Sequence, residues 1–247
     1  MELGLRGRRA LVTGASSGLG LACAQALAAE GATVVVSSRS ADRLAAAAAT
    51  MAGATPIVAD VAAAGAVEQL VADAVSVLGG IDILVANAGG PPPGDFASTD
   101  LDQYEPALRL NLLSTVAMCK ATVPAMQHQG WGRVVAITSI SVREPIGQLI
   151  LSNTARAGLT GFLKTLAREV AGDGVTVNSL QPGLHATDRL HSLYGDDLSG
   201  VAAGIPAGVV GDPGDFGRIA TFLCSDSARF ITGAAIPVDG GAAHGLQ

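Results

Sequence analysis

Short apolar runs alternate with longer amphipathic segments along almost the whole chain of 247 residues. The apolar runs are rich in Val and Ile and are bounded by Gly, Asp, Asn or Ser, which is typical of strands; they read RALVTG, TVVVSS, TPIVAD, DILVANAG, RVVAITS, VTVNSL and AAIPVDGG. Between them, apolar positions at helical spacing predict helices over about 18–30, 41–52, 64–78, 101–128, 150–171 and 214–224. Apolar strands that alternate with helices predict a parallel sheet covered on both faces.

One segment departs from this alternation of strands and helices. Residues 184–212 are rich in Gly and Asp and contain two histidines and a tyrosine. A long irregular insertion in an α/β domain often covers a ligand, so we expect 184–212 to be irregular and to form a substrate lid above the strand ends. No repeat or linker-like stretch interrupts the rest, and the chain is predicted to be one α/β domain over 1–247.

Composition narrows the function classes. Hydrophobic residues make up 49% of the chain and charged residues 15%, which indicates a well-buried globular protein. The net charge of −6 argues against generic affinity for nucleic acid or an anionic membrane. The three cysteines lie far apart among apolar neighbours, which favours buried free thiols over a metal site. No apolar run of membrane length and no secretory signal are evident, so a cytoplasmic location is expected.

A glycine-rich loop follows the first predicted strand. The stretch LVTGASSGLG places Gly14, Gly18 and Gly20 between that strand and the first helix. Glycine permits the tight turn and lets backbone N–H groups approach a pyrophosphate at the helix N-terminus. At the head of an alternating α/β chain, this arrangement predicts a dinucleotide-binding loop.

These motifs resemble those of the short-chain dehydrogenase/reductase family, and the resemblance covers nearly the whole chain. It is carried by Thr13-Gly14-x-x-x-Gly18-x-Gly20, Asp60-Val61, Ala86-Asn87-Ala88-Gly89 with Ala86 in place of an Asn, Asn111, Pro182-Gly183-x-x-x-Thr187 and the stretch ITGAAIPVDGG. The branch it resembles is that of the β-ketoacyl-acyl-carrier-protein reductases. The resemblance implies a Rossmann-type, doubly wound, seven-stranded parallel sheet.

The resemblance also implies the cofactor-binding residues. They are Gly14, Ser16, Ser17, Gly18, Leu19, Gly20, Ser38, Arg39, Asp60, Val61, Asn87, Ala88, Gly89, Arg156, Pro182, Gly183 and Thr187. It further implies a small-molecule or acyl-thioester substrate and a homotetramer or homodimer. The apolar face of the 150–171 helix, with Leu159, Phe162 and Leu166, is a candidate interface, although this face could instead pack only on the sheet.

The residues after the second strand bear on the choice of cofactor. An acidic side chain there would bind the ribose hydroxyls of NAD and repel a 2′-phosphate. The chain has Ser37, Ser38 and Arg39 instead, and hydroxyls with a guanidinium suit a phosphate monoester. The sequence therefore favours NADP(H) over NAD(H), with the alternative that Arg39 merely faces solvent.

The catalytic positions depart from the family pattern. The family uses a Ser, a Tyr thirteen residues later and a Lys four beyond it. Ser139 matches the serine, but the same spacing reaches Ser152 and Arg156. An aliphatic hydroxyl is a far weaker acid than a phenol, and arginine is effectively always protonated, so neither replaces the acid of the family. The resemblance still implies catalytic places for Asn111, Ser139, Ser152 and Arg156.

A few other residues are candidate proton donors or ligands. Tyr104 is expected to pack, Tyr194 could act only when the lid closes, and His185 is interpreted as a polar lid residue. Arg143 and Glu144 could bind a charged substrate group or face water. A metal site made of His185, Asp188 and His191 is improbable, because all three lie in one flexible segment without a second cluster.

Three functions are compatible with these residues. The first is a divergent NADP(H)-dependent oxidoreductase acting on a carbonyl or alcohol, similar to 3-oxoacyl-acyl-carrier-protein reductases. The second is a catalytically impaired dinucleotide-binding protein that serves as a regulatory or assembly subunit. The third, a non-redox enzyme, is disfavoured because the glycine loop is intact. The first is preferred, since the glycine loop, Asp60, Asn111 and Ser139 are all present.

Overall fold

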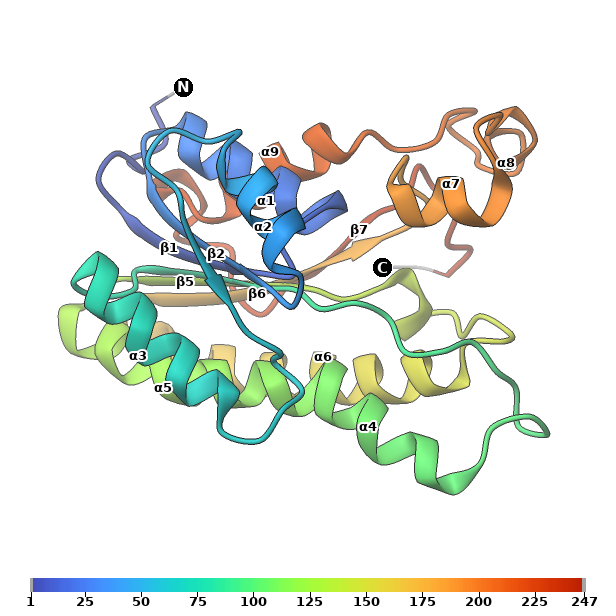
Figure 1. Cartoon of the computed structure of the whole chain (residues 1–247), viewed down its shortest axis with the longest axis horizontal. Helices are drawn as coiled ribbons and strands as arrows, with labels where there is room; N and C mark the ends of the chain where they lie inside the picture. The colour runs from blue at the N-terminus through green and yellow to red at the C-terminus, as the bar shows by residue number, and fades with distance from the viewer. Residues whose placement is uncertain (1, 246–247) are drawn as a thin grey trace.

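A seven-stranded parallel sheet forms the centre of the molecule in the computed structural model, which describes residues 2–245 (Figure 1). The strand order is β3-β2-β1-β4-β5-β6-β7. The strands are β1 (Arg9–Thr13), β2 (Thr33–Ser38), β3 (Thr55–Val58), β4 (Ile83–Ala86), β5 (Gly132–Ile137), β6 (Val175–Pro182) and β7 (Ala235–Val238). The doubly wound sheet with seven parallel strands is therefore confirmed. The order reverses between β1 and β4, and the carboxyl ends of strands at such a point are where α/β proteins bind ligands.

Helices cover both faces of the sheet. The longer ones are α1 (Gly18–Ala29), α2 (Ala41–Ala48), α3 (Ala66–Leu78), α5 (Ser114–Gln129), α6 (Ile150–Val170) and α9 (Pro213–Leu223). One apolar core includes Leu27, Leu44 and Phe216 of α1, α2 and α9, and the core on the other face includes residues of α3, α5 and α6. Figure 1 shows these two layers above and below the strands.

The predicted helix over 101–128 is a composite. A 3-10 turn, η1 (Leu101–Gln103), leads into α4 (Tyr104–Leu108), and a π-helical turn, η2 (Arg109–Leu113), joins α4 to α5. A π turn inserts an extra residue into the helical ladder and is frequent at functional sites. Here it contains Asn111.

The expected lid is more regular than predicted. Within 184–212 lie α7 (Asp188–Tyr194) and α8 (Ser199–Ala202), at the same end of the molecule as the loop that leads into α6 (Figure 1). Backbone hydrogen bonds from Ala186 to Gly211 and from Gly211 to Leu184, of 2.9 and 3.0 Å, close the base of the segment. We call residues 186–210 the lid segment. Within residues 2–245, no helix has the length and apolar character that a membrane crossing requires.

The packing of α9 against α1 depends on a glycine. A Cβ atom built at Gly217 would collide with the backbone carbonyl of Ala22. Because backbone atoms cannot move aside as a side chain can, Gly217→Ala is expected to lower the free energy of unfolding by ~1–3 kcal/mol, the usual cost of overpacking. Urea denaturation measures this. Gly172→Ala is the matched control, since its Cβ would meet nothing within 4 Å, and an equal loss in both variants would contradict the prediction.

Candidate active site

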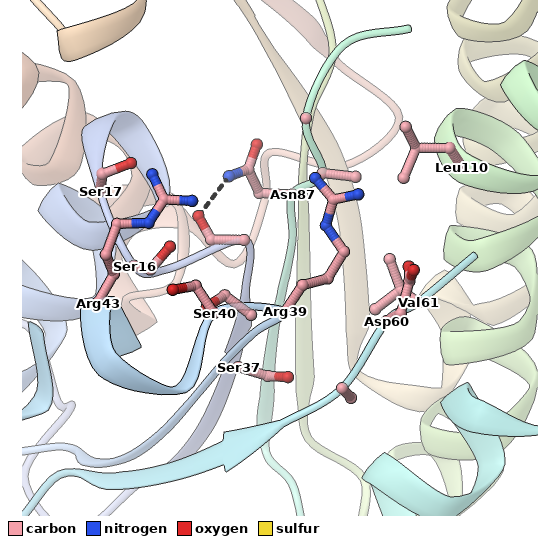
Figure 2. A pocket seen from close by; sticks show the side chains of 15 residues that line it. Ser16, Ser17, Ser37, Arg39, Ser40, Arg43, Asp60, Val61, Asn87 and Leu110 are labelled. Atoms are coloured by element: carbon pink, nitrogen blue, oxygen red, sulfur yellow. Dashed lines mark hydrogen bonds between the residues drawn. The ribbon is translucent and has the colours of Figure 1, made fainter. Parts of the chain in front are cut away.

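The glycine loop is tied to the end of β4 by a small set of hydrogen bonds. The hydroxyl of Thr13 donates to the carbonyl of Asn87 at 2.8 Å and accepts from the Asn87 amide at 3.0 Å. The side-chain amide of Asn87 donates to the carbonyl of Gly14 at 3.1 Å (Figure 2). A Cβ at Gly20 would strike both that carbonyl and the Asn87 amide, so the loop can turn this tightly only with glycine there.

A pocket of about 440 Å³ opens beside this loop at the carboxyl ends of β1, β2, β3 and β4. Figure 2 shows its lining. The lining residues are Gly14, Ser16, Ser17, Ser37, Ser38, Arg39, Ser40, Arg43, Ala59, Asp60, Val61, Asn87, Ala88, Gly89 and Leu110. The structure thus brings together most of the predicted cofactor-binding residues, in a hollow large enough for part of a dinucleotide.

The chemistry of the pocket fits a phosphate on the adenosine ribose. The Oγ atoms of Ser37 and Ser38 are buried and have no hydrogen-bond partner within residues 2–245. Arg39 and Arg43 both line the pocket, Arg43 beside Ser16 and Ser17 and Arg39 toward Asp60 and Val61 (Figure 2), and neither forms an ion pair in the described part of the chain. Two unpaired guanidinium groups and free hydroxyls are suitable donors for a phosphate monoester.

Arg43 is a residue that the sequence reasoning missed. It lies in the first turn of α2, four residues after Arg39, so the turn of the chain brings both cations to the same pocket. The available signal was this i,i+4 spacing across the start of a helix. Ser40, Ala59 and Leu110 were also missed.

The family resemblance implies that three residues contact the nicotinamide end of the cofactor: Pro182, Gly183 and Thr187. They lie outside the lining of this pocket, at the end of β6 and the start of the lid segment. Thr187 is packed over the first turn of α1, because a Cβ at Gly18 would lie 3.4 Å from its methyl carbon. Gly183 lies against Asp239, just beyond β7. Pro182, Gly183 and Thr187 therefore extend the site from the glycine loop toward the lid. Gly18, Leu19 and Gly20 belong to the first turn of α1.

Asn111 connects the π turn to the end of β4. Its side-chain amide donates to the carbonyl of Gly89 at 2.8 Å. Its Oδ1 atom is buried and accepts no hydrogen bond from any described residue. The π turn therefore holds the side-chain nitrogen of Asn111 against the loop after β4 and leaves its oxygen as an acceptor without a partner in residues 2–245.

Ser139 follows the end of β5 with only Thr138 between them, and its Oγ accepts a hydrogen bond of 3.1 Å from the amide of Ser141. The hydroxyl proton of Ser139 donates to no described group, because Oγ acts only as an acceptor there. A free O–H at the carboxyl end of a central strand can donate to a substrate oxygen.

Ser152 and Arg156 are both buried on α6, and they contact each other. Nε of Arg156 donates to Oγ of Ser152 at 3.2 Å. Nη1 of Arg156 donates to the carbonyls of Ile137 and Thr138 at 2.9 and 3.0 Å, at the end of β5. The i,i+4 spacing thus brings the pair together on one helix face, next to the strand end that precedes Ser139. The family resemblance implies that Arg156 reaches the nicotinamide ribose of the cofactor. This stays a prediction.

The other candidate proton donors, His185, Tyr194 and Tyr104, lie in places that are less suitable for donating a proton to a substrate. His185 is buried with its ring edge on Phe216, and burial lowers its pKa, so the imidazole is neutral at pH 7. Tyr194 is 55% exposed on α7, and Tyr104 is half-buried at the start of α4. Burial raises the pKa of all three cysteines, which keeps them as neutral thiols.

Arg143 and Glu144, the candidate substrate contacts, are engaged elsewhere in the fold. Arg143 donates to the side-chain oxygen of Gln181 and to the carbonyl of Ala235, both at 2.6 Å. Glu144 accepts from the backbone amide of His244 at 3.0 Å. Across residues 2–245, no group of three His, Cys, Asp or Glu is arranged to hold a metal ion.

The chain is similar to known proteins over almost its whole length. The family model described as "Enoyl-(Acyl carrier protein) reductase" matches residues 14–243. The chain is 37% identical to pig dehydrogenase/reductase SDR family member 4, over 98% of this chain and 89% of the relative. The chain belongs to the short-chain dehydrogenase/reductase family. It is also 35% identical to 3-oxoacyl-[acyl-carrier-protein] reductase of Aquifex aeolicus, over 98% of this chain and 99% of the relative.

Among solved structures, the fold of this short-chain dehydrogenase/reductase is similar to L-sorbose reductase from Gluconobacter frateurii, whose crystal structure is a complex with NADPH and L-sorbose. The TM-score is 0.93 at 33% identity, and the match covers 100% of both chains. The predicted family membership and fold are therefore confirmed. Within the family, this chain is of the oxidoreductase type.

Proposed function

We propose that the chain is an NADP(H)-dependent oxidoreductase that interconverts a carbonyl compound and its alcohol. The observation that carries the proposal is the pocket at the glycine loop, whose lining includes Arg39 and Arg43, without an ion pair in residues 2–245, and Ser37 and Ser38, whose buried hydroxyls have no partner there. NADPH in the crystal structure of L-sorbose reductase supports the same cofactor class. Acyl thioesters are a candidate substrate class, given the 3-oxoacyl-[acyl-carrier-protein] reductase relative.

When bound, the cofactor supplies a hydride to a carbonyl carbon or accepts one from an alcohol. Reduction consumes NADPH, one proton and the carbonyl compound and yields the alcohol and NADP⁺. Ser139 donates a hydrogen bond to the substrate oxygen and so stabilises the charge that develops on it. Arg156, a buried cation beside the end of β5, adds positive potential at the same strand end. The proton itself comes from solvent or from a hydroxyl that is a weak acid, which predicts slow turnover on simple ketones.

A second candidate function is that of a dinucleotide-binding regulatory or assembly subunit without turnover. The pair of Ser152 and Arg156 favours it, because an aliphatic hydroxyl that accepts a hydrogen bond from a guanidinium stands where the family pattern has its phenol, and neither group is a usable acid. Calorimetry with NADPH and NADH, followed by NADPH oxidation assays on a panel of ketones, oxo acids and acetoacetyl thioesters, separates the two. Binding with turnover supports the oxidoreductase, binding without any turnover supports the subunit, and absence of NADPH binding contradicts both.

We also propose that the protein acts as a homodimer or homotetramer in the cytoplasm. Its three free, buried cysteines are compatible with a reducing compartment. Leu159 is only 2% exposed and packs in the chain's own core, so it is not available to a partner, whereas Phe162 and Leu166 are half-buried against that core. Light scattering at micromolar concentration is expected to give the mass of two or four chains, and the mass of a single chain would reject the oligomer.

A further inference from the structure

Arg156 is a buried cation without a counter-ion. It is 8% exposed, and its hydrogen bonds go to the hydroxyl of Ser152 and to two backbone carbonyls. Within residues 2–245 it forms no ion pair, and Nη2 donates to no group although it is not sealed from solvent. A charge that is buried without a partner is costly, so proteins rarely keep one without a use.

A second buried arginine, Arg133 on β5, shows how the same fold compensates a guanidinium. Arg133 lies 3.7 Å from a carboxylate oxygen of Asp226 and packs over the ring of Trp131. It also donates to the carbonyls of Gly132, Gly174 and Ser225. Arg156 has the carbonyls but lacks the carboxylate, which leaves an unmatched positive charge at the carboxyl end of β5.

A second arginine adds to this charge instead of cancelling it. Arg189, on α7 in the lid segment, places its guanidinium over Gly90, since a Cβ there would lie 2.7 Å from Nη1. Arg189 has no ion pair in the described part of the chain. Burial and the nearby charge of Arg189 lower the pKa of Arg156 to about 10, so Arg156 remains a cation at pH 7.

The two arginines converge on adjacent strand ends. Strands β4 and β5 are neighbours in the sheet, with Ala86 opposite Ala136. Gly90 follows β4, and the carbonyls that Arg156 binds end β5, one residue before Ser139. Arg156 and Arg189 thus flank the place where Ser139 presents its free hydroxyl.

We propose that the substrate carries an anionic group, a carboxylate or a phosphate monoester, that binds between Arg156 and Arg189 while Ser139 holds the reacting oxygen. This inference rests on the proposed oxidoreductase function and narrows its substrate class to oxo acids, oxo phosphates and the corresponding alcohols. The planar guanidinium forks match the oxygens of either anion. Because Arg189 belongs to the lid segment and Arg156 to α6, an anion between them also draws the lid toward the sheet.

Matched pairs of probes test the role of the negative charge. Acetoacetate and methyl acetoacetate share a 3-oxo group and differ in charge, as do dihydroxyacetone phosphate and dihydroxyacetone. Dissociation constants are measured by calorimetry with the protein alone and with saturating NADPH, and rates by NADPH oxidation. At least one anionic member is expected to bind about 10-fold more tightly than its neutral partner, with NADPH present as well as without it. The pair that shows the larger ratio identifies the anion as a carboxylate or a phosphate.

Variants of Arg189 connect the charge preference to the site. Arg189→Gln is expected to remove most of the preference for the anion, and Arg189→Lys to keep part of it, because the charge remains but the fork is lost. Arg189 is exposed, so both variants are expected to fold like wild type. Arg168→Gln is the matched control: Arg168 is exposed on the same helix as Arg156, twelve residues further on, about 18 Å along the axis.

The outcomes separate this inference from the proposed function. Equal affinity for the charged and neutral members of both pairs would overturn the anion site, as would a preference that Arg189→Gln leaves intact. If NADPH fails to bind but the anions still bind in an Arg189-dependent manner, the oxidoreductase proposal fails and the anion site stands. If the preference disappears once NADPH is present, the arginines serve the cofactor's phosphates, and the substrate assignment is wrong.

Discussion

The double variant Ser152→Tyr with Arg156→Lys is expected to reduce simple ketones and acetoacetyl thioesters ~100–10,000-fold faster than the wild type, the range that a positioned general acid contributes. Ser152 and Arg156 are in direct contact on one face of α6, at 3.2 Å, beside the strand end that carries Ser139. A phenol and an ammonium group introduced there would lie close enough for the cation to lower the pKa of the phenol. The rate of NADPH oxidation measures the gain.

Each single variant is expected to recover less. Ser152→Tyr alone places the phenol beside a guanidinium that is fixed to the carbonyls of Ile137 and Thr138, and Arg156→Lys alone has no acid to assist. The matched control is Thr154→Tyr with Arg156→Lys, since Thr154 lies on the exposed side of the same turn. NADPH affinity is measured for every variant, so that a change in rate is not mistaken for a change in cofactor binding.

The wild type provides the decisive contrast. Its turnover on the same compounds is expected to be very slow. Fast reduction by the wild type that is unaffected by Ser152→Ala would show that the proton comes from another group, and the prediction would be wrong. His185 and Tyr194 would then be the first residues to change, even though His185 packs on Phe216 and Tyr194 faces solvent in this structure.

The regular parts of the fold could be predicted because their signal is local. Each of the seven strands is a short apolar run, and the long helices repeat apolar residues at the spacing that packs one face on the sheet. The π turn around Asn111 could not be predicted, since its extra residue does not interrupt the apolar pattern of the 101–128 segment. The two helices of the lid segment were missed because they span only seven and four residues, too few to show a helical repeat.

The cofactor side of the candidate site was predictable for a different reason. The glycine loop, Asp60 and Asn87 follow strands whose carboxyl ends share one edge, so their chain positions determine where they meet. The carbonyl partners of Arg156 lie at the end of β5, eighteen or nineteen residues away, and Arg189 reaches the site from the lid segment. No pattern within the sequence links these two arginines, because their proximity depends on how separate elements pack.

Arg39→Ala is expected to weaken NADPH binding ~10–100-fold and to leave NADH binding almost unchanged. The range corresponds to the ~1.5–3 kcal/mol of a charge-assisted hydrogen bond. Arg39 lines the pocket with Ser37 and Ser38, whose hydroxyls are free, and no carboxylate within residues 2–245 pairs with it. Removing the guanidinium therefore removes attraction for the 2′-phosphate, which NADH lacks. Calorimetry with both cofactors measures the difference.

Arg43 provides the internal comparison, because it lines the same pocket from the first turn of α2. If the two cations share the 2′-phosphate, Arg43→Ala is also expected to act on NADPH alone, and the double variant is expected to bind both cofactors about equally. Arg39→Lys is expected to retain part of the preference, since an ammonium group keeps the charge but not the fork. A wild-type preference for NADH would overturn the assignment of the cofactor. If Arg39→Ala weakened the binding of NADPH and NADH equally, Arg39 would support the pocket without contacting the 2′-phosphate.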